Sequence, residues 1–142
     1  MSEEKTNVMR LLEQKKVPYT PHQYPHQEGM AVDGATVAAV LGRDPASVFK
    51  TLVTRGATKA NYVFVVPVLA ELDLKKAARA VGEKSIEMIH VKELTPLTGY
   101  VRGGCSPIGM KKRFKTVLDQ SAADQAAILV SAGKIGCQVE LA

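Results

Sequence analysis

Lys50 is the residue of this chain whose setting most clearly suggests chemistry. It lies inside the alternating run Val48–Val53, which has the period of a β-strand, on the side that also carries Val48 and Leu52. A lysine among apolar side chains needs a partner or a ligand anion to offset its loss of hydration. A lysine at a sheet edge, with its ammonium group reaching into water, fits the same pattern. Lys50 is therefore a candidate anion-binding residue, with the solvated edge position as the alternative.

The loop 102–109 is a second candidate. Its sequence, Arg-Gly-Gly-Cys-Ser-Pro-Ile-Gly, has three glycines and one proline in eight positions. Such a loop can follow an unusual backbone path and approach a ligand closely, so we expect its contacts to come from backbone groups. A plain connecting loop has the same composition. The residues that follow Gly109 lack the Ser or Thr and the spacing of a phosphate-binding P-loop.

Cys105 and Ser106 are nucleophiles by residue type only. A nucleophilic Ser or Cys needs a base within hydrogen-bond reach and a third group that orients the base, and the loop is not a Gly-x-Ser-x-Gly turn. We expect Cys105 to be a small buried residue. Neither Cys105 nor Cys137, the only cysteines, lies in a cluster with zinc spacing, so we expect no disulfide framework and no metal site. The histidines are expected to be solvated at the surface: His22, His26 and His90.

Most of the excess positive charge lies in the second half of the chain. The 19 basic and 14 acidic residues give a net charge of +5, and the densest basic segment is Lys111, Lys112, Arg113 and Lys115. This segment would attract phosphate groups, although a run of lysines is also typical of a solvated face.

Length and composition predict one globular domain, residues 1–142. The hydrophobic fraction of 46% and the charged fraction of 23% exclude a disordered chain and a disulfide-built miniprotein. No apolar run reaches the roughly 18 residues needed to cross a bilayer. The first ten residues are acidic and polar, where a signal peptide would be basic and then apolar. We therefore expect a soluble, cytoplasmic protein without a membrane partner.

The pattern of apolar residues predicts an α+β fold. Three prolines place the extended segment 17–26 at a sheet edge, and runs 48–55 and 62–66 predict two adjacent antiparallel strands. The whole is expected to be a curved, mainly antiparallel (mixed) sheet or barrel with flanking helices. The other predicted elements are helices 2–16, 37–41 and 73–82, a turn opened by Asp44 and Pro45, short turns at 91–94 and 120–124, and strands 114–118, 128–131 and 137–141.

Four separated segments resemble the YbaK/EbsC family of aminoacyl-tRNA deacylases, freestanding relatives of the editing domain of bacterial prolyl-tRNA synthetases. They contain the Lys-Thr dipeptide at 50–51, the Gly-Gly-x-Ser-Pro-x-Gly loop and the late Ser-x-Gly-Lys-x-Gly, and they cover 49–52, 67–76, 98–109 and 130–141 in the family's order. The resemblance implies the family's editing-domain fold. It implies hydrolysis in trans of the ester that joins a wrong amino acid, most characteristically cysteine, to the proline tRNA. The resemblance also implies that the protein needs no cofactor. It implies the aminoacylated acceptor end of a tRNA as the partner and leaves open prolyl-tRNA synthetase as a second one.

The resemblance also implies roles for individual residues. Lys50 would hold the phosphate or ribose end of the acceptor strand, and the attacking group would come from the substrate, as its own thiol or its ribose 2′-hydroxyl. The catalytic residues would be Lys50, Gly104 and Ser106, with substrate-binding residues Tyr24, Met30 (or Val32), Thr51, Gly103, Cys105 and Pro107.

Two alternatives and one departure remain open. The chain could act on an alanyl ester, although Lys50-Thr51 in place of Lys-Asn favours cysteine, or it could bind nucleic acid without hydrolysis. Gln138 stands where family members carry an acidic residue, and it lies two positions before Glu140, a candidate salt-bridge partner.

Overall fold

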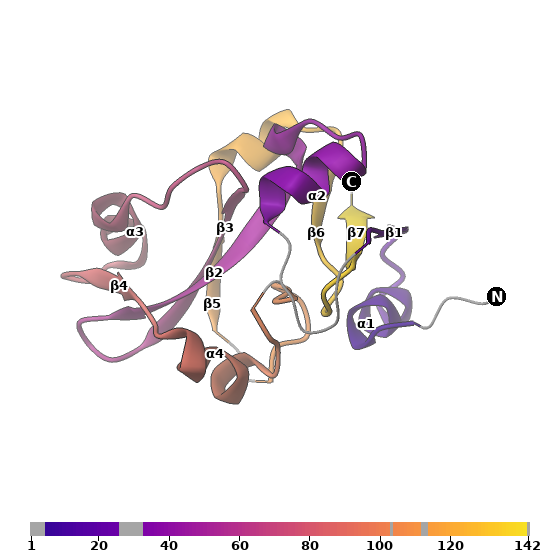
Figure 1. Cartoon of the computed structure of the whole chain (residues 1–142). Helices are drawn as coiled ribbons and strands as arrows, with labels where there is room; N and C mark the ends of the chain where they lie inside the picture. Colours follow the sequence, from indigo (N-terminus) through magenta and orange to yellow (C-terminus); the bar gives the residue numbers. More distant parts are fainter. Residues whose placement is uncertain (1–4, 26–32, 103, 112–113, 142) are drawn as a thin grey trace.

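The computed structural model describes residues 5–25, 33–102, 104–111 and 114–141, whose strands form two sheets (Figure 1). The first sheet is antiparallel and has the order β1-β7-β6, and the second has the order β4-β2-β3-β5, in which only β3 and β5 run parallel. The bounds are β1 (Thr20–Gln23), β2 (Phe49–Gly56), β3 (Asn61–Pro67), β4 (Ile86–Met88), β5 (Lys115–Leu118), β6 (Ile128–Ser131) and β7 (Cys137–Leu141). The expected α+β class with mainly antiparallel strands is confirmed.

The two sheets meet where β2 begins. A parallel bridge joins Val48, the residue before β2, to Leu129 of β6, and both side chains are almost fully buried. From this junction β2 pairs with β3 in the register that places Lys50 opposite Val66. The predicted antiparallel pair is thus confirmed, and so is the edge position of the proline-rich strand β1.

The helices begin and end at the residues that the sequence marks for this purpose. They are α1 (Asn7–Gln14), α2 (Gly34–Val40), α3 (Leu74–Val81) and α4 (Val91–Thr98), with short 3₁₀ turns η1 (Pro45–Ser47) and η2 (Gln120–Asp124). Asp33, Asp44 and Asp73 cap α2, η1 and α3 by accepting backbone N–H groups, as polar N-cap residues do. Gly82 ends α3 with a positive φ of 74°, which a glycine adopts without strain.

The segment that begins at Val91 differs from the prediction of a short turn. It is an eight-residue helix, α4, and Pro96 lies inside it. Two end contacts stabilise this helix despite the proline. The Glu93 carboxylate accepts the N–H of His90 at 3.1 Å, and Gly99 ends the helix with a φ of 83°. The short strand β4, which precedes this helix, is also absent from the sequence prediction.

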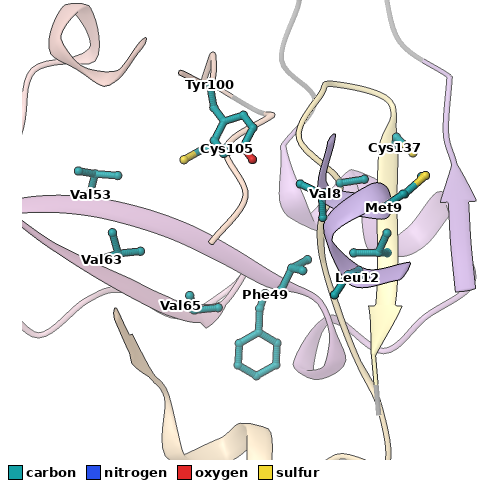
Figure 2. Packing of buried hydrophobic residues seen from close by; sticks show 13 residues of the cluster. Val8, Met9, Leu12, Phe49, Val53, Val63, Val65, Tyr100, Cys105 and Cys137 are labelled. Carbon is teal, nitrogen blue, oxygen red and sulfur yellow. The ribbon is translucent and has the colours of Figure 1, made fainter. Parts of the chain in front are cut away.

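The largest core cluster packs α1 against the sheets. Val8, Met9 and Leu12 form the buried face of α1, and Figure 2 shows them beside the strand that carries Cys137. On the other side the cluster contains Val53 of β2 and Val63 of β3. Among the described residues, no helix has the length and apolar character needed to span a bilayer.

Glu140 ties the edge strand β1 to the rest of the first sheet. Its Oε1 lies 2.8 Å from Nε2 of His22 on β1 and 2.8 Å from Nη2 of Arg43, which follows α2. The expected role of Glu140 as an ion-pair partner is confirmed. Because Gln138 lies on the same central strand, β7, this network also fixes the strand that carries it.

Candidate active site

A cavity of about 130 Å³ lies at the junction of the two sheets. Tyr24, Lys50, Thr51 and Cys105, four of the residues that the resemblance assigned to the site, line it together. Lys50 is the only charged side chain among the described residues of its wall. The other lining residues are Gly34, Val37, Val48, Phe49, Val68, Ser131 and Gln138. The arrangement is a small apolar chamber with one cation and a few polar groups.

Lys50 reaches this cavity because β2 begins at the sheet junction. The strand alternation gives Phe49 a buried position, 2% exposed, while Lys50 is half-buried. Among the described residues, no side-chain hydrogen bond or ion pair involves the Lys50 ammonium group. A half-buried ammonium group without a protein anion is suited to an anionic or strongly polar ligand, which is the first of the two interpretations that the sequence left open.

Two polar atoms of the cavity wall have no partner in the described part of the protein. They are Oγ1 of Thr51 and Oε1 of Gln138, and both are buried. Buried polar atoms in folded proteins nearly always have a hydrogen-bond partner, so these two groups are positioned for a ligand or a water molecule. The sequence identified Gln138 only as a departure from the family pattern. The structure places it in the site because β7 is the central strand of the first sheet, paired to β1 and β6.

Tyr24 lines the cavity, and a backbone hydrogen bond holds it in place. Its N–H donates to the carbonyl of Gly136 at 2.9 Å, which holds the end of the proline-rich segment against the turn before β7. The residue is only 6% exposed. Met30, Val32 and Gly103, the other wall and loop candidates, lie outside the described residues.

The glycine loop contributes Cys105 to the cavity wall, and its other described residues pack outside the cavity. Ser106 is fully buried, does not line the cavity, and its Oγ accepts the N–H of Ile108 at 3.2 Å. Pro107 is half-buried and also absent from the wall. Gly104 packs against the turn that precedes β7: a Cβ at this position would lie 2.9 Å from the backbone nitrogen of Ile135. The loop is therefore a close-packed support that presents Cys105 to the cavity.

Gly104→Ala is expected to destabilise the protein and to reduce its activity. The new methyl group meets backbone atoms, which cannot move aside as a flexible side chain would, so the loop must shift at a cost of roughly 1–3 kcal/mol. Thermal unfolding and deacylation rates would be measured side by side. Gly82→Ala is the matched control, because it introduces strain at a positive φ in open space, remote from the cavity. Equal activity losses in the two variants would remove Gly104 from the support of the site.

The Cys105 thiol is a poor nucleophile in this setting. Burial raises its pKa to about 11, against a smaller opposing effect of a hydrogen bond with the Thr98 side chain. The thiol is therefore protonated at neutral pH, whereas the thiolate is the reactive form. No histidine or carboxylate lies among the described residues of the cavity wall to accept its proton. Within the described ranges, no three His, Cys, Asp or Glu side chains are grouped so that they could hold a metal ion.

Cys105→Ala and Cys137→Ala are each expected to retain most of the deacylation activity, within a few-fold of the unaltered protein. Both thiols are buried, so the changes remove packing atoms but no reacting group. Initial rates with a cysteinyl-tRNA and melting temperatures would be compared for both variants. A Cys105→Ala protein that melts normally but is inactive would establish a covalent cysteine mechanism.

Comparisons with solved structures identify the fold. The chain matches a proposed trans-editing enzyme for prolyl tRNA synthetase with a TM-score of 0.78 and 22% identity, over 97% of this chain and 87% of that one. It matches a hypothetical protein with a TM-score of 0.84 and 19% identity, over 95% and 87%. At these identities the likeness establishes the editing-domain fold.

Sequence comparisons then identify the family. Residues 29–142 match the aminoacyl-tRNA editing domain. The chain is also 50% identical, over 99% of its length and 85% of the relative's, to a proposed Cys-tRNA(Pro)/Cys-tRNA(Cys) deacylase, EbsC, of Enterococcus faecalis. The chain belongs to the aminoacyl-tRNA editing domain family, and it is an aminoacyl-tRNA deacylase. The resemblance to YbaK/EbsC proteins is thereby confirmed.

Proposed function

We propose that this protein removes cysteine from tRNA(Pro) in trans, with the aminoacyl group in the cavity of about 130 Å³ beside Lys50. The observation that carries the proposal is the size and lining of this cavity. Binding sites for drug-sized ligands usually measure about 300–1,000 Å³, so this chamber has room for a small side chain and an ester but not for a nucleotide. The E. faecalis relative, at 50% identity, is named as a proposed deacylase of Cys-tRNA(Pro) and Cys-tRNA(Cys), which supports the first of these as the substrate here.

A separate hydrolytic site is needed because a synthetase cannot select its amino acid with sufficient accuracy by binding alone. Small side chains differ too little in binding energy for a synthetase to reject every wrong one at a single site. The ester of an aminoacyl-tRNA is already reactive, so the deacylase needs to position it and to stabilise the negative charge that develops on its carbonyl oxygen. In the proposed arrangement the Lys50 ammonium group faces this charge, and Thr51 and Gln138 offer buried polar atoms that have no hydrogen-bond partner among the described residues.

The apolar part of the wall also admits a smaller acyl group. The cavity wall includes Val37, Phe49 and Val68. The alanine side chain is a methyl group, which is smaller than the cysteine side chain and lacks its sulfur. Hydrolysis of alanyl-tRNA(Pro) is therefore the second candidate activity.

The test compares cysteinyl and alanyl esters on the same tRNA(Pro) body, with release of the amino acid followed over time. The proposal expects faster release of cysteine. Faster release of alanine would move the assignment to the second candidate. Tight binding of both tRNAs without release of either amino acid would identify a binding module and contradict both.

The proposal includes electrostatic attraction between the tRNA and the basic segment. Lys111 and Lys115 are exposed, while Lys112 and Arg113 lie outside the described residues. Each phosphate that a lysine neutralises releases counterion and contributes roughly 0.7–0.9 to the slope of log affinity against log salt. Lys111→Ala combined with Lys115→Ala is expected to flatten this slope by about one to two units, measured with uncharged tRNA(Pro).

The double variant Lys75→Ala, Lys76→Ala on α3 is the control for this measurement, because it removes the same charge from another exposed face. An identical slope for both double variants would show that the basic segment is only a solvated face.

A further inference from the structure

Strand β5 lies at the edge of the second sheet. The strand order β4-β2-β3-β5 gives β5 a neighbour on one side only among the described residues. Three of its four residues, Lys115, Thr116 and Leu118, are exposed, and Val117 is half-buried. An edge strand presents a row of unpaired backbone N–H and C=O groups to any strand that approaches it. Strand β5 can therefore accept a further strand.

The free backbone groups of β5 belong to Thr116 and Leu118. The N–H of Asp119 donates to the carbonyl of Val65 on β3 at 2.8 Å, and Val65 is the register partner of Leu118. In a parallel pair, alternate residues of a strand bond to the neighbouring strand. Val117 and Asp119 therefore bond to β3. The N–H and C=O groups of Thr116 and Leu118 point away from β3, toward the open edge.

Apolar surface flanks this open edge. Leu118 is 49% exposed and lines two hollows, of about 440 and 360 Å³. On the face that α3 covers, Val117 packs at the margin of the buried cluster that contains Phe64 and Ala77. Exposed apolar side chains beside hollows are typical of a binding surface. A strand added at this edge would cover part of both Val117 and Leu118.

The charges of β5 favour a second copy of the same strand as the partner. Lys115 and Asp119 stand two positions on either side of Val117, so the three side chains lie on one face. In an antiparallel pair centred on Val117, each Lys115 lies directly opposite Asp119 of the other copy. None of the described ion pairs involves either residue. Asp119 accepts the N–H of Ser121 through Oδ2 at 3.0 Å, and no hydrogen bond of the described residues involves its Oδ1.

The backbone supports the same register as the charges. Pairing centred on Val117 places Thr116 opposite Leu118 of the second copy, so the residues with free N–H and C=O groups bond to each other. A shift by one residue would set a free residue opposite one that already bonds to β3. A shift by two residues would restore the backbone bonds but separate Lys115 from Asp119. Of these registers, only the one centred on Val117 satisfies both the backbone and the charges.

We propose that two copies of this protein associate through β5, as an antiparallel pair centred on Val117 that joins their four-stranded sheets into one. Such an interface uses the same surface of both copies, and two ion pairs between Lys115 and Asp119 flank the Val117 contact. A lysine on an edge strand normally opposes pairing, but here an aspartate of the second copy lies opposite it. Because the interface is small, the association is reversible. This dimer goes beyond the proposed function and does not depend on it.

The first test measures the mass of the unaltered protein by sedimentation equilibrium, at concentrations of about 5 to 500 μM, which detect micromolar association. No tRNA is added, because Lys115 also belongs to the basic segment. The proposal expects a reversible equilibrium between monomer and dimer. A monomer at every concentration would overturn it.

The second test reverses one charge of the strand. Lys115→Glu sets two carboxylates opposite each other at both ends of the pair, so the dissociation constant of the dimer is expected to rise at least about tenfold. Lys111→Glu is the matched control, because it makes the same change of charge at an exposed residue outside β5. Equal effects of the two variants would show that β5 is not the interface.

The third test blocks the open edge without changing charge. Thr116→Pro removes an N–H that points away from β3, and proline is tolerated at such a position of an edge strand. We expect this variant to keep a melting temperature within a few degrees of the unaltered protein and to stay monomeric. Thr116→Ala, which keeps the N–H, should still form the dimer. A dimer of unchanged strength in Thr116→Pro would contradict pairing through β5.

The fourth test reads the register by cross-linking. Residues that face each other in a non-hydrogen-bonded antiparallel pair have Cα atoms about 4.5 Å apart, which a disulfide can span. Val117→Cys is therefore expected to form a disulfide-linked dimer at least about tenfold faster than Thr116→Cys, although Thr116 is the more exposed residue. The native thiols, Cys105 and Cys137, are buried. Faster cross-linking of Thr116→Cys, or equal rates for the two variants, would overturn the register centred on Val117.

Discussion

Replacing Lys50 with alanine is expected to lower kcat/KM for cysteinyl-tRNA(Pro) by about 100- to 1,000-fold, the loss typical of removing one group that stabilises a developing oxyanion. The reason is the position of Lys50 as the only charge among the described residues of the cavity wall. Its ammonium group has no protein anion in the described part of the chain, so its removal breaks no ion pair of the folded state. We therefore expect a melting temperature within a few degrees of the unaltered protein.

Two further variants make the Lys50 result interpretable. Lys50→Arg keeps the charge but changes the geometry of the donor, and it should restore part of the activity. Lys75→Ala removes an exposed lysine from α3 and should leave the activity unchanged. Unaltered turnover by Lys50→Ala at subsaturating substrate would remove Lys50 from the site and return it to the interpretation of a solvated edge lysine.

Removing one reactive group from the substrate is expected to have an effect of similar size. The cavity wall holds no histidine or carboxylate among its described residues, and burial keeps Cys105 protonated by raising its pKa to about 11. We therefore expect the attacking group to come from the substrate, as its thiol or its terminal 2′-hydroxyl, in line with the resemblance to the family. In the thiol route the sulfur forms a bond to the carbonyl carbon, the ester C–O bond breaks, and the thiol proton goes to the departing ribose oxygen. Water then hydrolyses the thioester so formed.

The measurement uses two modified substrates with the unaltered enzyme. In one, 2-aminobutyrate replaces cysteine on tRNA(Pro), which exchanges the thiol for a methyl group. In the other, the tRNA ends in 2′-deoxyadenosine. Substrate assistance predicts that at least one of these changes nearly abolishes hydrolysis. Normal reaction of both substrates, together with an inactive Cys105→Ala variant, would replace this account with a covalent cysteine mechanism.

Local sequence signals predicted most of the secondary structure because they act over a few residues. The alternation around Lys50 identifies β2 and places the lysine on a strand face, and Asp73 and Gly82 mark both ends of α3. Helix α4 escaped prediction because Pro96 normally interrupts a helix. Its stability comes from the contact between Glu93 and the N–H of His90 and from the glycine at its end.

The site itself was only partly predictable, because its walls come from both sheets. Gln138 enters the cavity through the pairing of β7 with β1 and β6, and the sequence contains no local signal for that register. Ser106 shows the opposite case. Its place in a characteristic loop suggested a catalytic role, but its hydroxyl group is buried and accepts a hydrogen bond within the loop. We propose that it positions the loop rather than contacts the substrate.

The most direct test of the central claim compares cysteinyl-tRNA(Pro) with prolyl-tRNA(Pro), so that only the amino acid differs. The account predicts rapid, enzyme-dependent release of cysteine and a kcat/KM for the prolyl ester at least about 100-fold lower, because useful editing must spare the correct product. Equal rates for the two esters, or no release of cysteine above the rate without enzyme, would contradict it.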